Sequence, residues 1–473
     1  MTITPDAPRE EVPPSLEPLL PVEDVQAEAT PHEQPGLRIP PLSVPTRTVP
    51  LFCFLLAIGA MVLAFTYANV HHRTSAEMAS NPGMVRTSFS INFWVERGYI
   101  RAGGLLMRPA PTAPGFYIYL SSTGGHLFSA YVLEKLWKVA TGHTSLPLIA
   151  LQNQIVTLLL AALVGLLAFR LATRMGSSPL HALFLATCVE VVHFTFPDNL
   201  AMFWELSGRQ PFLIFAAAFL LIEERCIDGR TPTLTTAQGV AAFLAMYMEY
   251  GAGAAFLASY VVVSMLLGVE RMTIKRILTV AIFPLLLTLA LFGLQRKIAT
   301  AQYPTATKYG SNFLFRSGLD GSSQYYGTHL DIANGRDLPR RNFKQNQKFL
   351  FEWTWSFFAG SAALTMIILF GARGRIPPIV LVSLLSLLGS YLLYAALFSQ
   401  AFVIHPYLFD VLLFTPLMLA LFVIAPSFVE SLTAQRGVFV AVIFFLAAWV
   451  TMVQLRQYAL RYPLPPPATR AHS

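Results

Sequence analysis

Glu96 is the residue whose type and surroundings best suit chemistry at a membrane surface. It stands in a short aromatic and polar run that follows the first long hydrophobic segment and contains Asn92, Trp94, Glu96, Arg97, Tyr99 and Arg101. A carboxylate there can act as a general base, which accepts a proton from a hydroxyl group within hydrogen-bond reach. A second interpretation stays open: residues 89–104 form an interfacial helix that only anchors the segment, because tryptophan and tyrosine favour that depth.

Three further side chains could bind an anion outside the membrane. His126 follows a Gly-Gly turn, and Arg340 and Arg341 lie in the long polar stretch 295–350. Arginine binds phosphate oxygens through paired N–H donors, so these residues predict a phosphate site. The alternatives are a structural histidine at the interface and arginines that are attracted to anionic lipid headgroups.

Three ionisable residues fall inside or between predicted membrane segments. Glu190 and His193 are three residues apart and therefore share one face of a helix, and Glu249 lies between two short segments. Ionisable groups in a membrane helix usually point into the bundle or into a cavity. They predict a structural polar pair, part of a donor site, or the coupling residues of a transporter.

The composition limits the class of protein. Of the 473 residues, 55% are hydrophobic and only 12% are charged, whereas a soluble domain carries roughly 25% charged residues. The net charge of +8 comes from loops between hydrophobic segments, so we expect no nucleic-acid partner. Cys53, Cys188 and Cys226 have no spacing that is typical of a disulfide framework or a zinc site.

The hydrophobic segments predict an all-α polytopic membrane protein with about 11 transmembrane helices, because long continuous apolar runs suit helices whereas barrel strands alternate. The candidate spans are 50–69, 148–172, 179–196, 209–224, 234–248, 251–268, 276–294, 352–371, 377–398, 408–427 and 437–456. Two polar stretches become long outer loops, the first outer loop 70–147 with interfacial helices and the long outer loop 295–350.

Short basic connections orient the chain. They contain Arg170 and Arg174, Arg225 and Arg230, Arg271 with Lys275 and Arg276, Arg373 and Arg375, and Arg436. Such loops stay in the cytoplasm, and all of them fall there if the N-terminus is inside. We therefore expect a multi-pass protein of a bacterial inner membrane, with a disordered Pro-rich cytoplasmic tail over 1–48, a transmembrane domain over 49–456 and a C-terminal tail over 457–473.

The orientation also bears on residues 234–268, which could form one long helix or two short ones. Both flanking loops are basic, so the chain should cross twice, with a break near Glu249 where Gly251 and Gly253 permit a turn. A single span with a re-entrant piece is the alternative.

Several short motifs follow one another in an informative order. They are Glu96-Arg97-Gly98-Tyr99 through Gly103-Gly104, then Pro109, then Phe116-Tyr117-Ile118-Tyr119 through Leu136 to Gly142, and later His405-Pro406-Tyr407-Leu408 followed by Pro416. Together with the first span, this layout resembles the GT-C superfamily of membrane glycosyltransferases, which use polyprenyl-phosphate sugars. Protein mannosyltransferases and lipid A aminoarabinose transferases are related members. The resemblance covers most of residues 50–456 in layout.

The resemblance implies that Glu96 is the catalytic residue and that Arg97 and His405 bind the substrate. The chain departs from the family at one place. Many members carry an acidic pair at the start of the interfacial helix, near the position of Ser88 in this chain. No aspartate lies within 76–109, and Glu96 comes about two helical turns later.

The resemblance also points to a metal. Asp198 and Glu205 lie in a polar loop where some GT-C oligosaccharyltransferases bind a divalent cation. With Glu96 they could supply three of the oxygen ligands that hard cations need. The alternative is a loop that caps the next helix, and members that use monophosphate donors often need no metal.

Two classes of function follow. The first is a glycosyltransferase that moves a hexosyl or pentosyl group from a polyprenyl-phosphate donor, held in the lipid bilayer, to an envelope glycan, lipid or protein on the outer face. The second is a polytopic transporter or lipid flippase. A non-catalytic envelope-assembly protein is a further alternative.

Overall fold

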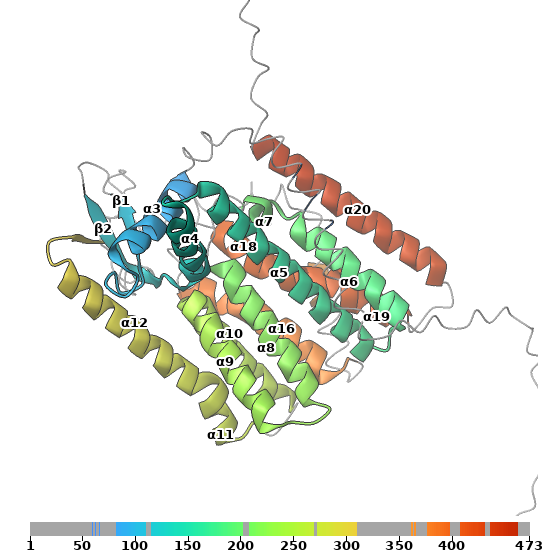
Figure 1. The fold of residues 1–473 in the computed structure, drawn as a ribbon. Helices are drawn as coiled ribbons and strands as arrows, with labels where there is room; N and C mark the ends of the chain where they lie inside the picture. Colours follow the sequence, from blue (N-terminus) through green and yellow to red (C-terminus); the bar gives the residue numbers. More distant parts are fainter. Residues whose placement is uncertain are drawn as a thin grey trace, which may run out of the picture. The chain divides into compact units, whose positions relative to one another are not determined.

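Helices make up most of the chain in the computed structural model (Figure 1). The structure describes residues 82–109, 115–201, 208–268, 272–309, 376–397, 407–430 and 436–461, with a few isolated helical positions at 59, 62, 66, 361, 362, 364 and 365. The spans expected over 50–69 and 352–371 therefore lie almost wholly outside the described residues, as do the predicted tail over 1–48 and most of the long outer loop.

The described part of the predicted first outer loop folds into what we call the sheet lobe. It consists of α3 (Pro82–Arg97), β1 (Leu105–Pro109), β2 (Phe116–Thr123), the 3-10 turn η1 (Gly125–Leu127) and α4 (Phe128–Thr141). Strand β2 pairs antiparallel with β1 and parallel with β3 (Thr307–Tyr309), which comes from the start of the long outer loop. Helices were expected in this stretch, but the sheet was not, and the interfacial position of the helices stays a prediction.

Helix α3 begins and ends earlier than the helix expected over 89–104. It stops at Arg97 because Gly98 adopts a left-handed conformation with φ +94°, and its N–H bonds to the carbonyl of Trp94 at 2.9 Å. Two side chains of α3 fix it to β1. Trp94 Nε1 donates to the carbonyl of Leu105 at 2.9 Å, and Ser90 Oγ donates to the carbonyl of Met107 at 2.6 Å.

The remaining helices form a bundle beside the sheet lobe (Figure 1). They are α5 (Leu146–Arg174), α6 (Pro179–Phe194), α7 (Pro197–Ala201), α8 (Arg209–Cys226), α9 (Pro232–Met248), α10 (Tyr250–Leu267), α11 (Ile274–Ile277), α12 (Phe283–Gln302), α16 (Pro378–Leu397), α18 (Tyr407–Leu419), α19 (Ala425–Glu430) and α20 (Arg436–Arg461), with π-helical segments at η2 (Leu278–Ile282) and η4 (Ala420–Ile424). Ser178 and Thr231 cap α6 and α9, and a proline follows each cap, as is common at helix starts.

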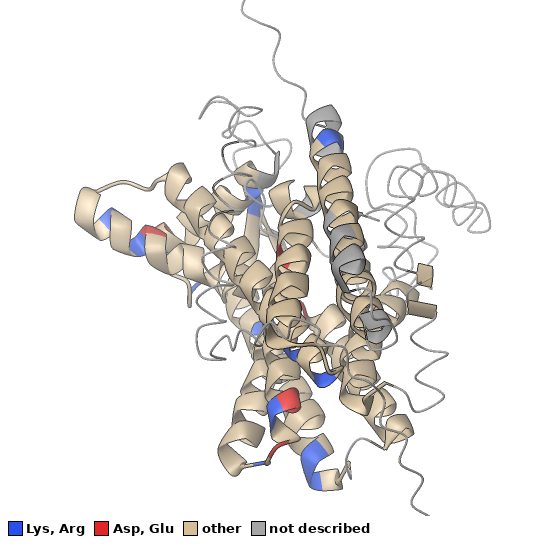
Figure 2. Cartoon of the chain, turned by 90° about the vertical axis from the view of Figure 1, so that its right-hand side faces the viewer, with Lys and Arg blue, Asp and Glu red and all other residues tan. Residues whose placement is uncertain are grey.

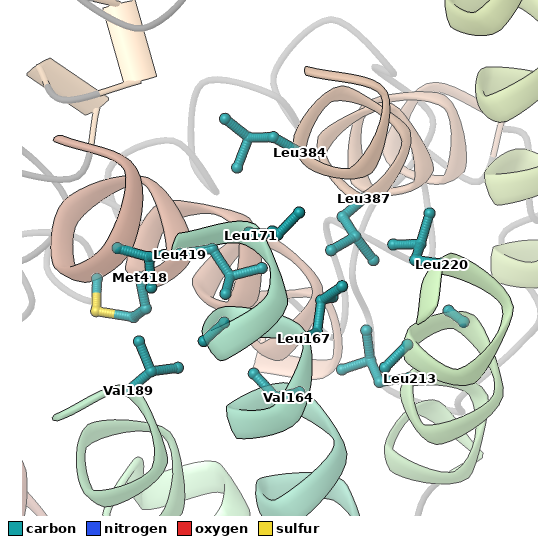
Figure 3. Packing of buried hydrophobic residues seen from close by; sticks show 14 of the residues in the cluster. Val164, Leu167, Leu171, Val189, Leu213, Leu220, Leu384, Leu387, Met418 and Leu419 are labelled. Atoms are coloured by element: carbon teal, nitrogen blue, oxygen red, sulfur yellow. The ribbon is translucent and has the colours of Figure 1, made fainter. Parts of the chain in front are cut away.

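The core of the bundle is built from branched aliphatic side chains. Figure 3 shows Leu167 of α5, Leu213 of α8, Leu387 of α16 and Leu419 of α18 directed into one shared space. All of them are almost completely buried. Interdigitation of this kind supplies the van der Waals contacts that hold the helices together.

One end of the bundle holds what we call the charged cluster. Arg170 and Arg174 of α5 bind Glu224 through their Nε atoms at 2.8 and 2.7 Å. Next to it, Glu223 accepts from Arg276 and from Arg230. Elsewhere the described helices carry few charges (Figure 2). The basic connections before α6, α9 and α12 therefore lie at one common end, as their composition predicted.

The chain breaks between α9 and α10 at a single residue. Glu249 has an extended backbone (φ −148°, ψ 94°), and the two helices on either side pack against each other. A Cβ atom on Gly253 would lie 2.6 Å from the Cα of Met246, so the chain folds back closely here. The prediction of two short helices is confirmed.

Four of the described helices are long and apolar enough to cross a membrane: Leu146–Arg174, Tyr250–Leu267, Ile274–Gln302 and Pro378–Leu397. Shorter apolar helices are Pro179–Phe194, Val411–Ser427 and Phe445–Arg456. The described residues do not support the expected number of about 11, because two of the expected spans lie almost wholly outside them and because α6 and α9 have only 16 and 17 residues against the roughly 20 that a span needs. The described helices are compatible with a membrane protein.

Candidate functional site

Glu96, the expected base, lies on the exposed side of the last turn of α3. Its side chain is 62% exposed and pairs with Lys138 of α4, with 3.7 Å between Lys138 Nζ and Glu96 Oε1. Arg97 beside it is also exposed. The structure thus places both residues on the surface of the sheet lobe, and an exposed pair of this kind contributes little to stability.

His126 lies in a different environment. It is only 8% exposed, and its Nδ1 atom has no hydrogen-bond partner among the residues that the structure describes. Burial, followed by the positive charges of Arg209 and Arg108, lowers the pKa of His126 from 6.5 to about 4. The two guanidinium groups therefore lie within electrostatic reach of a neutral imidazole, at the end of the bundle that carries the sheet lobe. We call these three residues the basic cluster.

Each member of the basic cluster comes from a different element. Arg108 lies in β1, where its guanidinium carbon stands 4.1 Å from the centre of the Tyr119 ring on β2. His126 lies in η1, and Arg209 is the first residue of α8. The first N–H groups of α8 have no intrahelical acceptor, and the helix dipole makes this end positive. Two arginines, a helix start and a buried histidine with an open ring nitrogen suit an anion such as phosphate.

Hydrogen bonds hold the sheet lobe against the bundle beside this cluster. The hydroxyl of Tyr247 in α9 lies 3.0 Å from that of Tyr99 and accepts from Gln295 Nε2 of α12 at 2.8 Å. Thr123 of β2 donates to the carbonyl of Tyr247. A Cβ atom on Gly125, next to His126, would lie 2.7 Å from the Tyr247 ring. The end of α9 and the turn that carries His126 are therefore in direct contact.

Glu249 provides a carboxylate at the same end. It is buried, and its Oε1 accepts a hydrogen bond from the hydroxyl of Tyr394 in α16 at 3.0 Å. A Cβ atom on Gly208 would lie 3.1 Å from Glu249 Oε2, and Gly208 directly precedes Arg209. The break between α9 and α10 thus places a carboxylate beside the start of α8, close to the basic cluster.

The two ionisable residues inside α6 are both buried. His193 is held by side chains of other elements, because its Nε2 lies 3.0 Å from Thr415 Oγ1 of α18 and its Nδ1 lies 3.2 Å from Asn199 Nδ2. Glu190 packs against α5, where a Cβ atom on Gly165 would collide with Glu190 Oε1. His193 serves a structural network.

The other expected site residues lie outside the described residues: Glu205, Arg340, Arg341 and His405. Asp198 lies in the short helix α7, and nothing is described of its side chain. In the part of the chain that is described, no group of three or more His, Cys, Asp or Glu side chains could hold a metal ion. The predicted trio of Asp198, Glu205 and Glu96 remains a prediction.

The sequence prediction of an anion site included His126 but neither Arg108 nor Arg209. Arg108 and Arg209 stood in segments expected to be a connector and a membrane span, and neither carries a local signal of function. Arg209 does follow Gly208 and lies two residues before Pro211, and a proline in the first turn marks a helix start. That start could have suggested an anion site if its position beside His126 had been known.

Comparison with models of known protein families and with curated protein sequences gives no match to this chain.

Proposed function

We propose that this chain is a membrane glycosyltransferase that moves a hexosyl or pentosyl group from a polyprenyl-phosphate donor to an envelope glycan, lipid or protein. One observation carries the proposal: His126 and Arg209 are buried, Arg108 is half-buried near them, and the carboxylate of Glu249 lies beside the start of α8 that carries Arg209. Phosphate recognition needs the cations, and acceptor activation needs the carboxylate. The resemblance of the sequence layout to the GT-C superfamily points to the same reaction.

In this proposal the basic cluster holds the phosphate of the donor. When the bond between the sugar carbon and the phosphate oxygen breaks, the electron pair and the growing negative charge stay on the phosphate. Arg108 and Arg209 stabilise that charge in a site from which water is largely excluded, and such stabilisation is a large catalytic contribution. His126 is neutral at pH 7 and can donate or accept one hydrogen bond to the phosphate.

The attacking hydroxyl of the acceptor must lose its proton to a base. The geometry favours Glu249 over Glu96, because Glu249 is buried beside Arg209 whereas Glu96 is exposed and paired with Lys138. The bond from Tyr394 would hold the Glu249 carboxylate in place. Glu96 remains the second candidate, since it is the residue that the family layout selects.

The same proposal includes the topology. The shorter helices α6, α8, α9, α18–α19 and α20 would cross the membrane with the four longer ones. The charged cluster would then face the cytoplasm, since basic connections stay there. The sheet lobe and the basic cluster would face the outer side of a bacterial inner membrane, where polyprenyl-phosphate donors present their sugars.

The test is a transfer assay with the purified full-length protein, radiolabelled polyprenyl-phosphate sugars and envelope extract as the source of acceptor. Arg209→Gln and Glu249→Gln should each lower transfer by at least about 100-fold, and Arg209→Gln should also weaken binding of sugar-free polyprenyl phosphate. Lys297→Gln is the matched control, because it removes an exposed positive charge of α12 that lies outside the cluster.

The outcomes separate the candidates. If Glu249→Gln keeps full sugar transfer and Glu96→Gln loses it, Glu96 is the base. Full transfer by Arg209→Gln would contradict the phosphate site. The transporter or flippase alternative is favoured by the broken pair α9–α10 with a carboxylate at its break. It would be supported by ion-coupled uptake without transfer from any donor, and inactivity in both assays would favour an envelope-assembly role.

A further inference from the structure

Asn153 of α5 is a buried amide without a partner. Its side chain is completely buried, and neither Oδ1 nor Nδ2 has a hydrogen-bond partner among the residues that the structure describes. Leaving such a group unpaired away from water costs free energy. Asn199 of α7 is just as buried, but its Nδ2 atom bonds to the ring and to the carbonyl of His193. The unpaired amide is therefore particular to position 153.

Asn153 lies at the same level of the bundle as Arg209. Helices α5 and α8 run in the same direction and meet at the charged cluster, where Arg170 binds Glu224. Asn153 comes 17 residues before Arg170, and Arg209 comes 15 residues before Glu224. With the helical rise per residue, both lie roughly 22–26 Å from the charged cluster. Asn153 is therefore level with the start of α8, at the end of the bundle that carries the sheet lobe.

Both residues also face the interior of the bundle. Leu171 comes 18 residues after Asn153, which is about five full turns, so the two share one face of α5. Leu213 comes one turn after Arg209 and shares its face of α8. Figure 3 shows Leu171 and Leu213 directed into the core between the helices. Asn153 and Arg209 thus lie at the sheet-lobe end of that same interior.

A hydrogen bond ties the turn of His126 to the same part of α5. Gln152, which precedes Asn153, donates from Nε2 to Ser129 Oγ in the first turn of α4 at 2.7 Å. Ser129 comes three residues after His126, whose Nδ1 atom also lacks a partner in the described part of the chain. The unpaired amide of α5 therefore adjoins the basic cluster.

The chemistry of an amide suits a hydroxyl group better than a phosphate. An amide presents an oxygen that accepts and an NH2 group that donates, and a sugar hydroxyl also does both. A phosphate oxygen only accepts, and the guanidinium groups of the basic cluster already supply donors for it. A site that is built to bond a hydroxyl group discriminates against ligands that lack it, because its own buried polar atoms then stay unpaired.

We propose that Asn153 binds a hydroxyl group of the donor's sugar and so determines which sugar the protein accepts. This inference rests on the proposed glycosyltransferase function, because it places the sugar beside the phosphate that Arg108 and Arg209 hold. The amide oxygen accepts a hydrogen bond from the sugar, and the amide NH2 group donates one to it. Both unpaired atoms of Asn153 then gain partners when the donor binds.

The first measurement is the thermal stability of the full-length protein in detergent without a ligand. Leucine has nearly the shape of asparagine but no polar atoms, so Asn153→Leu should raise the Tm by about 1–3 °C. Asn199→Leu is the matched control, because it removes an equally buried amide that has partners, and it should lower the Tm. An unchanged or lower Tm for Asn153→Leu would show that this amide has a structural role and would overturn the proposal.

The second measurement compares ligands. Wild type and Asn153→Leu are titrated with polyprenyl phosphate, with polyprenyl-phosphate mannose as a hexose probe and with polyprenyl-phosphate arabinose as a pentose probe. The wild type should bind at least one sugar-carrying probe at least about 10-fold more tightly than polyprenyl phosphate. Asn153→Leu should lose this preference and bind polyprenyl phosphate as the wild type does.

The outcomes separate this inference from the proposed function. The same preference in both proteins would overturn the role of Asn153, and so would an equal loss of all three ligands by Asn153→Leu. A wild type that binds none of the three ligands would instead contradict the glycosyltransferase itself, and the sugar contact would fall with it even if the Tm of Asn153→Leu rises.

Discussion

At the level of single residues, burial and nearby positive charge both lower the pKa of His126. Burial and the nearby guanidinium groups of Arg209 and Arg108 depress its pKa from 6.5 to about 4. Between these two values the unfolded chain binds a proton that the folded protein does not. The contribution of His126 to stability is therefore complete above pH 6.5 and is lost as the pH falls toward 4.

Replacement of His126 by glutamine should flatten this part of the pH profile. The wild type should lose up to about 3 kcal/mol more than His126→Gln between pH 6.5 and 4, measured by thermal unfolding in detergent without phosphate. His143→Gln, at an exposed position in the connection before α5, should leave the slope unchanged. Parallel slopes for the wild type and His126→Gln would show that the histidine titrates normally.

The three residues of the basic cluster differ in how far the sequence alone could reveal them. His126 was identified because a Gly-Gly turn beside a polar residue is a local signal. Arg108 and Arg209 were not, because their meaning depends on β1, η1 and α8 meeting in space. Glu96 was selected because polar and aromatic residues surround it in the sequence. In the structure these residues do not share one environment: Glu96 is exposed, whereas Trp94 is buried.

At the level of elements, the contact between the sheet lobe and α12 depends on Gly103. This residue has φ +65°, and a Cβ atom there would collide with the carbonyl oxygen of Gln295. Gly103→Ala should therefore destabilise the protein by roughly 2–4 kcal/mol, from backbone strain and a clash with the α12 backbone.

Gly293 is the matched control for this measurement. It lies in α12, the helix that Gly103 contacts. A Cβ atom on Gly293 would meet no other atom within 4 Å, and its backbone is not left-handed. Gly293→Ala should be neutral or stabilising by about 0.5–1 kcal/mol. Thermal unfolding of both variants checks the pair, and a Gly103→Ala protein as stable as the wild type would refute the close packing.

Elements with a strong local pattern were predictable from the sequence. Helix α5 follows from a long apolar run with basic residues at its end, and the break at Glu249 follows from the basic connections on both sides. The sheet was missed because β1 has five residues and β3 only three, and because β3 comes from nearly 200 residues further along the chain. Pairing of such distant short strands leaves no periodic signal.

At the level of the whole molecule, the two ends of the bundle differ in chemistry. The charged cluster lies at the end where α5 and α8 finish, and the sheet lobe lies where both helices begin. The rise of α8 from Arg209 to Glu224 separates these ends by roughly 20 Å, which is less than the thickness of a hydrocarbon core.

This arrangement predicts opposite labelling of two exposed positions. In a cysteine-free background, Glu96→Cys should react with a membrane-impermeant maleimide in intact spheroplasts. Asp228→Cys, next to the charged cluster, should react only after permeabilisation. Both sites reacting from the same side, whichever side it is, would contradict the proposed topology.

The charged cluster has a mechanical consequence. Glu224 joins α8 to α5, while Glu223 joins it to α9 through Gln238 and to α11 through Arg276, whose guanidinium also bonds the Tyr260 hydroxyl of α10. Two adjacent residues of α8 therefore tie four other helices together at one level. Loss of the Glu223 carboxylate would take the ion pair away from the buried guanidinium of Arg276, so α8 acts as the common anchor of this end of the bundle.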